Sequence, residues 1–214
     1  MTLDVRSQME RIYRELPPGE IPWNLEDPPR VLVDLLESGR VAPCDAIDLG
    51  CGAGNYAVWL AGQGFRVTGI DLSTAAVARA AALARERAVA CRFLACDLLA
   101  PVPVFEACFD FAFDWEVLHH VFPENRSRYA ANVHRLLRPG ATYLSVCFAE
   151  DDPGLPGQGK YRHTPLGTVL YLSSERELRD LFEQWFEVEL LGTIDVAGKR
   201  GPHRAVRALL TKRE

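Results

Sequence analysis

The sequence predicts an α/β protein built on a single doubly wound, mostly parallel seven-stranded sheet with a terminal antiparallel hairpin. β-rich runs alternate with amphipathic helical patterns along most of the chain. A glycine-rich turn follows the first β-rich run, and the last two β-rich runs have no helix between them. Alternating strands and helices favour a parallel sheet with helices on both faces, and two successive strands favour an antiparallel pair.

The composition favours one globular domain with added segments. Of the 214 residues, 48% are hydrophobic and 25% are charged, as in an average folded protein. The net charge of −5 lacks the basic footprint of a nucleic-acid or anionic-membrane binder, so a small molecule is the expected partner. No apolar run approaches the ~20 residues of a membrane span. The six cysteines form no C-x-x-C pair, which indicates reduced, mostly buried thiols in a cytoplasmic protein without a metal site.

The first half of the chain contains a helix followed by alternating strands and helices. The helix is expected from Asp27 to Gly39, with Asp27 as its N-cap. Ser73 is expected to cap an alanine-rich helix that runs to Ala88. The other predicted elements of this half are a strand over 44–49, a helix over 55–62 and strands over 65–70 and 90–95.

A fourth strand is predicted in the middle of the chain, with Phe109, Phe111 and Phe113 on one of its faces. The apolar spacing after it predicts a helix that Pro139-Gly140 stops. A fifth strand is expected over 141–148.

The last third of the chain begins with residues 150–167, which are rich in proline and glycine. They are expected to form a long surface loop with a functional role. A capping box of Ser174 and Glu177 then begins the last helix. The runs 186–196 and 204–211 are expected to pair as the terminal hairpin.

The strongest motif is Asp48-Leu49-Gly50-Cys51-Gly52-Ala53-Gly54-Asn55, between the first of these strands and the next helix. Ligands of open α/β sheets bind at such turns, where glycine lets the backbone approach them with a positive φ. A dinucleotide-binding turn needs its third glycine where this chain has Asn55. This difference disfavours an NAD(P)-dependent oxidoreductase, which is kept as an alternative together with a non-catalytic cofactor-binding protein.

The pattern D-x-G-x-G-x-G resembles that of class I S-adenosylmethionine-dependent methyltransferases of the small-molecule type. The resemblance extends from about Trp23 to Arg213 and implies a Rossmann-like methyltransferase fold. It implies that residues 41–214 form the domain that binds S-adenosylmethionine, with residues 1–40 as a helical cover segment. The activity that it implies is methyl transfer to a small thiol, metalloid, oxygen or nitrogen nucleophile.

The resemblance also implies roles for single residues. Asp71 would accept hydrogen bonds from both ribose hydroxyls, because a carboxylate is an acceptor only. Asp97 would accept from the adenine amine, with the Leu98 amide beside the ring. The other residues that it places at the cofactor are Asp48, Gly50, Cys51, Gly52, Asn55, Leu72, Asp114 and Trp115.

The segment containing Tyr13 and Trp23 resembles the cover of thiopurine and tellurite-resistance methyltransferases. An aromatic face beside a sulfonium gains a cation–π contribution of ~0.5–2 kcal/mol, so Trp23 is expected to close over the cofactor. The run from Lys160 to His163 is expected to add cationic and aromatic contacts as a lid.

The chemistry needs little from the protein beyond orientation, exclusion of water and removal of a proton. An oxygen or nitrogen acceptor requires a general base, and the candidates are His119, His120 and Tyr13. A thiolate acceptor requires little help from a base. A nucleic-acid acceptor is disfavoured, because the fourth strand is followed by Trp115-Glu116-Val117 rather than by Pro-Pro-aromatic.

Overall fold

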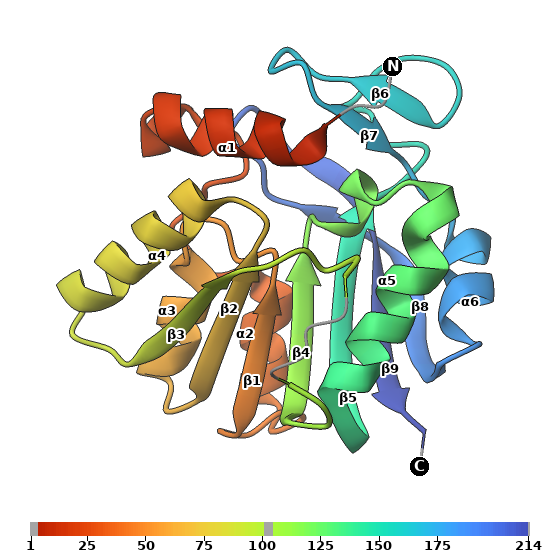
Figure 1. Cartoon of the computed structure of the whole chain (residues 1–214). Helices are drawn as coiled ribbons and strands as arrows, with labels where there is room; N and C mark the ends of the chain where they lie inside the picture. The colour runs from red at the N-terminus through yellow and green to blue at the C-terminus, as the bar shows by residue number, and fades with distance from the viewer. Residues whose placement is uncertain (1–3, 101–104, 214) are drawn as a thin grey trace.

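The computed structural model describes residues 4–100 and 105–213. Seven strands form one sheet in the order β3-β2-β1-β4-β5-β9-β8, and two more form a small separate sheet (Figure 1). The main sheet contains β1 (Asp45–Leu49), β2 (Arg66–Asp71), β3 (Cys91–Ala95), β4 (Phe109–Trp115), β5 (Leu137–Phe148), β8 (Phe186–Val196) and β9 (His203–Lys212). The small sheet pairs β6 (Tyr161–His163) with β7 (Val169–Tyr171).

The strand pairing confirms the predicted doubly wound sheet and its terminal hairpin. Strands β1 to β5 are parallel, whereas β9 runs antiparallel to both β5 and β8. The chain builds outward from β1 to β3 and then returns to β4 on the other side of β1. In an open sheet, the crevice at the carboxyl ends of the strands where the order reverses is the usual ligand site.

Helices cover both faces of the sheet. Residues of α5 and α6 share one core with Ile47 of β1, whereas residues of α2 and α3 share a second core with Ala46. Adjacent residues of a strand point to opposite faces, so one short strand supplies both cores. Helix α1 lies across the carboxyl ends of the strands (Figure 1). The helices are α1 (Val5–Glu15), α2 (Arg30–Glu37), α3 (Asn55–Gly62), α4 (Thr74–Glu86), α5 (Pro123–Leu136) and α6 (Glu175–Phe182), with single turns η1 (Pro18–Glu20) and η2 (Leu118–His120).

The three phenylalanines of β4 do not share a face, contrary to the prediction. Phe109 packs into the core beneath α5 and α6, whereas Phe111 and Phe113 pack into the core beneath α2 and α3. The register between β4 and β5 shifts between Phe109 and Phe111. Such an irregularity moves the residues on either side of it to opposite faces of the sheet.

Two predicted helix boundaries were wrong. Helix α2 begins at Arg30 rather than at Asp27, and Pro29 is its N-cap. A residue before proline is disfavoured in the helical region, which excludes Asp27 and Pro28 from the helix. Helix α5 ends at Leu136, and Pro139-Gly140 lies inside β5 instead of ending the helix. Leu137 already pairs with Phe109 in the sheet, so strand pairing ends the helix three residues earlier.

The segment 150–167 is not one long loop. Its residues 161–163 form β6, which pairs antiparallel with β7 and makes a hairpin above the carboxyl edge of the sheet. The capping box is present as predicted, since the Ser174 and Glu177 side chains and backbone amides cap each other at α6.

The cysteines are all free, but only Cys51 and Cys147 are buried. The prediction that most of them are buried was wrong. The other four are half-buried, and Cys91 lies in β3 at the edge of the sheet, where one side lacks a neighbouring strand. No helix in the described ranges combines the length and the apolar character that crossing a bilayer requires.

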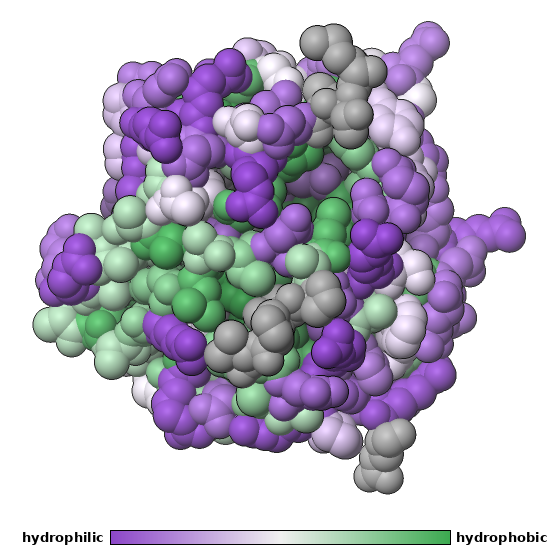
Figure 2. All heavy atoms as spheres, in the orientation of Figure 1, coloured by the Kyte–Doolittle hydropathy of each residue, from purple (hydrophilic) through white to green (hydrophobic). Residues whose placement is uncertain are grey.

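Figure 2 shows where the exposed hydrophobic residues of one face gather. They lie over α4 and β3, whereas hydrophilic residues dominate the margins of this view. No residue of β3 is fully buried, in contrast to the buried runs of β1 and β2. The apolar surface on this face therefore belongs to the β3 edge of the sheet.

Candidate active site

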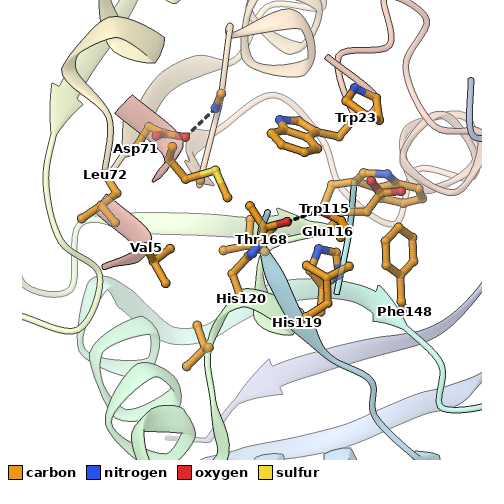
Figure 3. Close-up of a pocket in the computed structure, with 18 of the residues that line it drawn as sticks. Val5, Trp23, Asp71, Leu72, Trp115, Glu116, His119, His120, Phe148 and Thr168 are labelled. Carbon is orange, nitrogen blue, oxygen red and sulfur yellow. Dashed lines mark hydrogen bonds between the residues drawn. The ribbon is translucent and has the colours of Figure 1, made fainter. Parts of the chain in front are cut away.

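A cavity of about 1080 Å³ opens at the carboxyl ends of the central strands. The turn after β1 and η2 form its base, and α1, η1 and the β6–β7 hairpin close over it. Figure 3 shows Asp71 and Leu72 at one side of it and Trp23, Trp115 and Phe148 at the other. Small-molecule pockets usually measure ~300–1,000 Å³, so this cavity has room for a cofactor and an acceptor together.

The three glycines of the turn have positive φ angles, as the motif predicts, and each meets protein atoms. A Cβ on Gly52 would lie 2.5 Å from the Tyr13 hydroxyl oxygen, and a Cβ on Gly50 would lie 2.4 Å from a methyl of Val117. Gly54 packs against α4, where a Cβ would lie 2.9 Å from the Ala80 Cα atom. The glycines therefore bring α1, η2 and α4 close to the turn, in addition to opening its backbone to the cavity.

Asp71 ends β2 with its carboxylate held at the cavity. One oxygen accepts from the Gly52 amide at 2.9 Å, and the other accepts from the Ser73 amide at 2.8 Å. Burial raises the pKa of Asp71, and the two amides counteract part of that shift. Each oxygen keeps a free lone pair, so the carboxylate can accept two further donors such as a pair of ribose hydroxyls.

Asp97, Leu98 and Leu72 line the same side of the cavity. The Asp97 carboxylate accepts from the Leu99 amide at 2.8 Å, which fixes the turn after β3. The second Asp97 oxygen lies 3.8 Å from the Arg6 guanidinium of α1. Together with Asp71, this wall fits the nucleoside part of the cofactor that the resemblance implies.

Asp48 and Cys51 also line the cavity, and both are buried. Burial raises the pKa of Asp48 well above its usual range, and the neighbouring carboxylates Asp71 and Asp114 raise it further. A cationic ammonium or sulfonium in the cavity would reduce this repulsion between carboxylates.

Asp114 lies close enough to Asp48 to affect its pKa, but it is not among the residues that line the cavity. Its side chain is fully buried, does not line the cavity and accepts a hydrogen bond from the Tyr143 hydroxyl. Trp115 and Glu116 line the cavity instead. Adjacent strand residues face opposite sides, so Asp114 points with Tyr143 into the core beneath α5.

Tyr13 and Trp23 meet at the cover of the cavity. The Trp23 indole N–H donates to the Tyr13 hydroxyl oxygen at 2.8 Å, and the Trp23 ring meets His120 edge-on at 6.3 Å. Burial raises the pKa of Tyr13 far above its usual range, so this phenol stays protonated. Asn55 joins the start of α3 to the segment after Trp23. Its amide donates to the Asn24 side chain and to the Leu25 carbonyl, both at 2.9 Å.

His119 and His120 both line the cavity, and burial lowers the pKa of both. The pKa of His120 falls to about 4, and that of His119 falls well below its usual range. The His119 ring stacks on Phe148 with a centroid distance of 4.4 Å and an interplanar angle of 10°. Both imidazoles are neutral at pH 7 and have a low affinity for a proton.

The cationic side chains of the hairpin do not reach the cavity, contrary to expectation. Lys160 forms ion pairs with Glu150 and Glu177, at 2.9 and 2.5 Å. Arg162 is buried and donates to the backbone carbonyls of its own loop. Of the run 160–163, only Tyr161 lines the cavity.

Sequence reasoning missed two groups of this cavity. Glu116 has a φ of +64°, and burial raises its pKa to about 8. His203 lines the cavity and pairs with Asp152, which lies 51 positions earlier in the chain. Histidine and aspartate so far apart give no local signal, although Asp152 lies in the loop expected to be functional. No cluster of metal-ligating side chains occurs in the described ranges.

The chain is similar to several methyltransferases. Residues 46–140 match the family described as a methyltransferase domain. The chain is 26% identical over 193 residues to 2-heptyl-1-hydroxyquinolin-4(1H)-one methyltransferase of Mycobacteroides abscessus, over 88% of this chain and 80% of that one. It is 30% identical over 136 residues to probable thiol methyltransferase 2 of Arabidopsis thaliana, over 63% of this chain and 59% of the plant protein.

A solved structure extends the similarity to the whole fold. It is Burkholderia thailandensis 1,6-didemethyltoxoflavin-N1-methyltransferase with bound 1,6-didemethyltoxoflavin and S-adenosylhomocysteine. The TM-score is 0.74 at 25% sequence identity, and the superposition covers 98% of this chain and 87% of that chain.

Proposed function

Because this chain belongs to the class I S-adenosylmethionine-dependent methyltransferases and transfers a methyl group to a small molecule, we propose that its acceptor is a planar aromatic compound. The observation that carries the proposal is the division of the cavity into two unlike walls. One wall presents carboxylates and backbone amides, and the other presents aromatic rings.

The first wall would hold the cofactor. S-adenosylmethionine supplies a methyl group already activated on a sulfonium. In this proposal Asp71 accepts from the ribose hydroxyls, and Asp97 and Leu98 contact the adenine. The glycine turn and Asp48 receive the amino-acid end. The free lone pairs of Asp71 and the raised pKa of Asp48 support these assignments.

The second wall would hold the acceptor. Trp115 is fixed edge-on against Tyr56 at 6.5 Å, and Phe148 is fixed by the stacked His119 ring. Trp23 and Tyr161 also line the cavity, from the cover and from the hairpin. Flat aromatic walls stabilise planar ligands by about 0.5–1.5 kcal/mol per ring pair beyond the area that is buried. The names of the quinolinone and toxoflavin relatives support an oxygen or nitrogen acceptor.

A panel of acceptors with labelled cofactor tests this proposal. We expect methylation of hydroxy- or amino-substituted heteroaromatic compounds and little methylation of aliphatic thiols, thiocyanate or tellurite. The variant Trp115→Leu should raise KM for the aromatic acceptor about 2- to 10-fold, and Trp185→Leu, outside the cavity, should not. Methylation of small inorganic anions alone would overturn the assignment.

The proposal includes a reducing, cytoplasmic setting without nucleic-acid partners. Support comes from the six free cysteines and from the net charge of −5. Retention of activity in millimolar reductant, with loss on oxidation, is the expected outcome. Inactivation by the reductant would contradict it.

A further inference from the structure

His203 forms a fixed pair with a buried carboxylate at the cavity. Its Nδ1 lies 2.7 Å from an Asp152 oxygen, and the Asp152 side chain has no exposed surface. The other Asp152 oxygen accepts from the backbone amides of Gly154 and Arg204, both at 2.9 Å. The carboxylate is therefore held by two amides and presents its remaining oxygen to the imidazole.

Two glycines shape the space around this imidazole. A Cβ on Gly154 would lie 2.5 Å from Nδ1 of His203, and a Cβ on Gly198 would lie 2.6 Å from its Cδ2 atom. Neither glycine has a positive φ, so their missing side chains matter for space and not for backbone conformation. Phe148 packs on the ring at a centroid distance of 4.7 Å. The ring is thus confined by Asp152, Phe148 and two glycines.

The remaining polar atom of the ring is Nε2. It has no hydrogen-bond partner within residues 4–100 and 105–213, and the side chain keeps 22% of its surface exposed where it lines the cavity. Because Nδ1–H donates to the carboxylate, the neutral ring carries its lone pair on Nε2. A carboxylate partner also stabilises the imidazolium that forms when Nε2 takes a proton.

The other candidates for a general base are less suited to the task. Among the residues that the structure describes, His119 and His120 have no acidic partner, and burial disfavours their protonated forms. The Tyr13 oxygen already accepts from Trp23, and Glu116, with a pKa raised to about 8, is protonated at neutral pH. His203 alone among these groups combines a free lone pair with a fixed anionic partner.

We propose that His203, positioned by Asp152, is the general base that removes the proton from an O–H or N–H acceptor. The proton passes to Nε2, and the electron pair of the broken O–H or N–H bond stays on the acceptor heteroatom, which attacks the methyl carbon. The bond from that carbon to the sulfonium sulfur breaks, its electron pair stays on sulfur, and S-adenosylhomocysteine is the leaving group. The imidazolium then returns its proton to water. The inference rests on the proposed aromatic acceptor, and it adds that this acceptor is protonated when it binds.

The test compares two acceptors of one ring type, one protonated and one already anionic at the assay pH. We expect His203→Gln to lower kcat at least ~100-fold for the protonated acceptor and less than ~3-fold for the anionic one. Asp152→Asn should lower kcat for the protonated acceptor at least ~10-fold, with KM nearly unchanged. Asp151→Asn, at an exposed carboxylate paired with Arg204, is the matched control and should leave both rates unchanged.

Gly154→Ala provides a second variant that keeps the imidazole and displaces it. It should reproduce the selective loss, with the affinity for S-adenosylhomocysteine and the melting temperature close to those of the wild type. Equal losses with both acceptors, or no loss with either, in a folded His203→Gln variant would overturn the role of His203. A wild-type enzyme that methylates no aromatic acceptor would instead overturn the proposed function, and one that methylates only acceptors without an ionisable proton would overturn both.

Discussion

Asp71 combines a folding role with the binding role proposed for it. Its two oxygens accept from Gly52 and Ser73, so the same carboxylate orders the glycine turn and the start of α4. Because each oxygen has further acceptor capacity, ligand donors can be added without breaking either bond.

We predict that Asp71→Asn weakens the binding of S-adenosylhomocysteine about 10- to 100-fold. The amide nitrogen cannot accept a ribose hydroxyl, and hydrogen bonds to a charged group contribute about 1.5–3 kcal/mol. Calorimetric titration measures the dissociation constant, with the melting temperature as a check on folding. An unchanged dissociation constant would remove Asp71 from the binding site, and tight NADH binding by the wild type would contradict the cofactor assignment.

Asp114 is a buried carboxylate whose structural role can be separated from binding. Burial raises its pKa from 3.8 to about 6, so the folded state holds a proton there that the unfolded state releases. This group therefore stabilises the fold more at pH 4, and that contribution is lost as the pH rises from about 4 to 6.

We predict that Asp114→Asn removes this loss and raises the free energy of unfolding at pH 7.5 by up to about 3 kcal/mol relative to the wild type. The Asn oxygen can still accept from the Tyr143 hydroxyl. Urea unfolding at pH 4 and pH 7.5 measures the effect. Because Asp114 does not line the cavity, cofactor affinity should stay within 2-fold, and a larger loss would show that Asp114 acts in binding.

At the scale of elements, the Glu10 side chain of α1 holds this helix against the start of α4. The Glu10 carboxylate accepts from the Ser73 hydroxyl at 2.7 Å, from the Thr74 hydroxyl at 2.8 Å and from the Ala75 amide at 3.2 Å. It therefore caps the first turn of α4, where a negative charge is favourable. The Ser73 hydrogen bond is the main cause that lowers the pKa of Glu10 to about 2.

We predict that Glu10→Gln destabilises the fold by about 1 kcal/mol at pH 7. A lowered carboxyl pKa gives stability that is complete above about pH 4.5 and is lost as the pH falls towards 2. The difference between the two proteins should therefore shrink in acid. Thermal unfolding at pH 7 and pH 3 compares them, and a constant difference would show that the charge of Glu10 contributes nothing.

The cover of the cavity consists of segments tied to one another by long side chains. Lys199 donates to the carbonyls of Pro18 and Gly19, at 3.1 and 3.0 Å, and Gln8 donates to the carbonyl of Gly167 at 3.2 Å. These bonds are exposed, and such weakly packed segments open first.

We predict that hydrogen exchange slows in residues 11–23 and 151–167 when cofactor and acceptor are added, while the strands change little. Closure over the sulfonium excludes water and aligns the acceptor for attack. Lys199→Ala should speed exchange near Pro18 in the free protein. Fast exchange in both segments of the fully active complex would show that the site works open.

At the scale of the whole molecule, strand order decides where the cavity lies. The chain reverses between β1 and β4, so the turn after β1 and the residues after β4 meet at one crevice. Residues 1–40 were expected to form one cover segment, but the described ones lie in two different places. Helix α1 and η1 lie over the cavity, whereas α2 packs Leu32 into the core with Ala57 and Leu60.

Local sequence predicted the elements whose ends depend on nearby residues. The bounds of α3, the Ser73 cap and the Ser174–Glu177 capping box all follow from hydrogen bonds within four positions. The glycine turn and the position of Asp71 could also be predicted from local sequence, because each depends on the end of one strand and the turn that follows it.

Tertiary structure decided what depends on packing between distant segments. The irregularity after Phe109, the end of α5 at Leu136 and the inward side of Asp114 follow from pairing between strands and from which face meets which helix. The pairing of His203 with Asp152 spans 51 positions and requires β9 to lie beside β5. By itself the sequence determined the fold class, the glycine turn and the kind of cofactor. Which side chains line the rest of the cavity was decided only by the tertiary structure, because contacts between segments so far apart leave no periodic or short-range pattern in the chain.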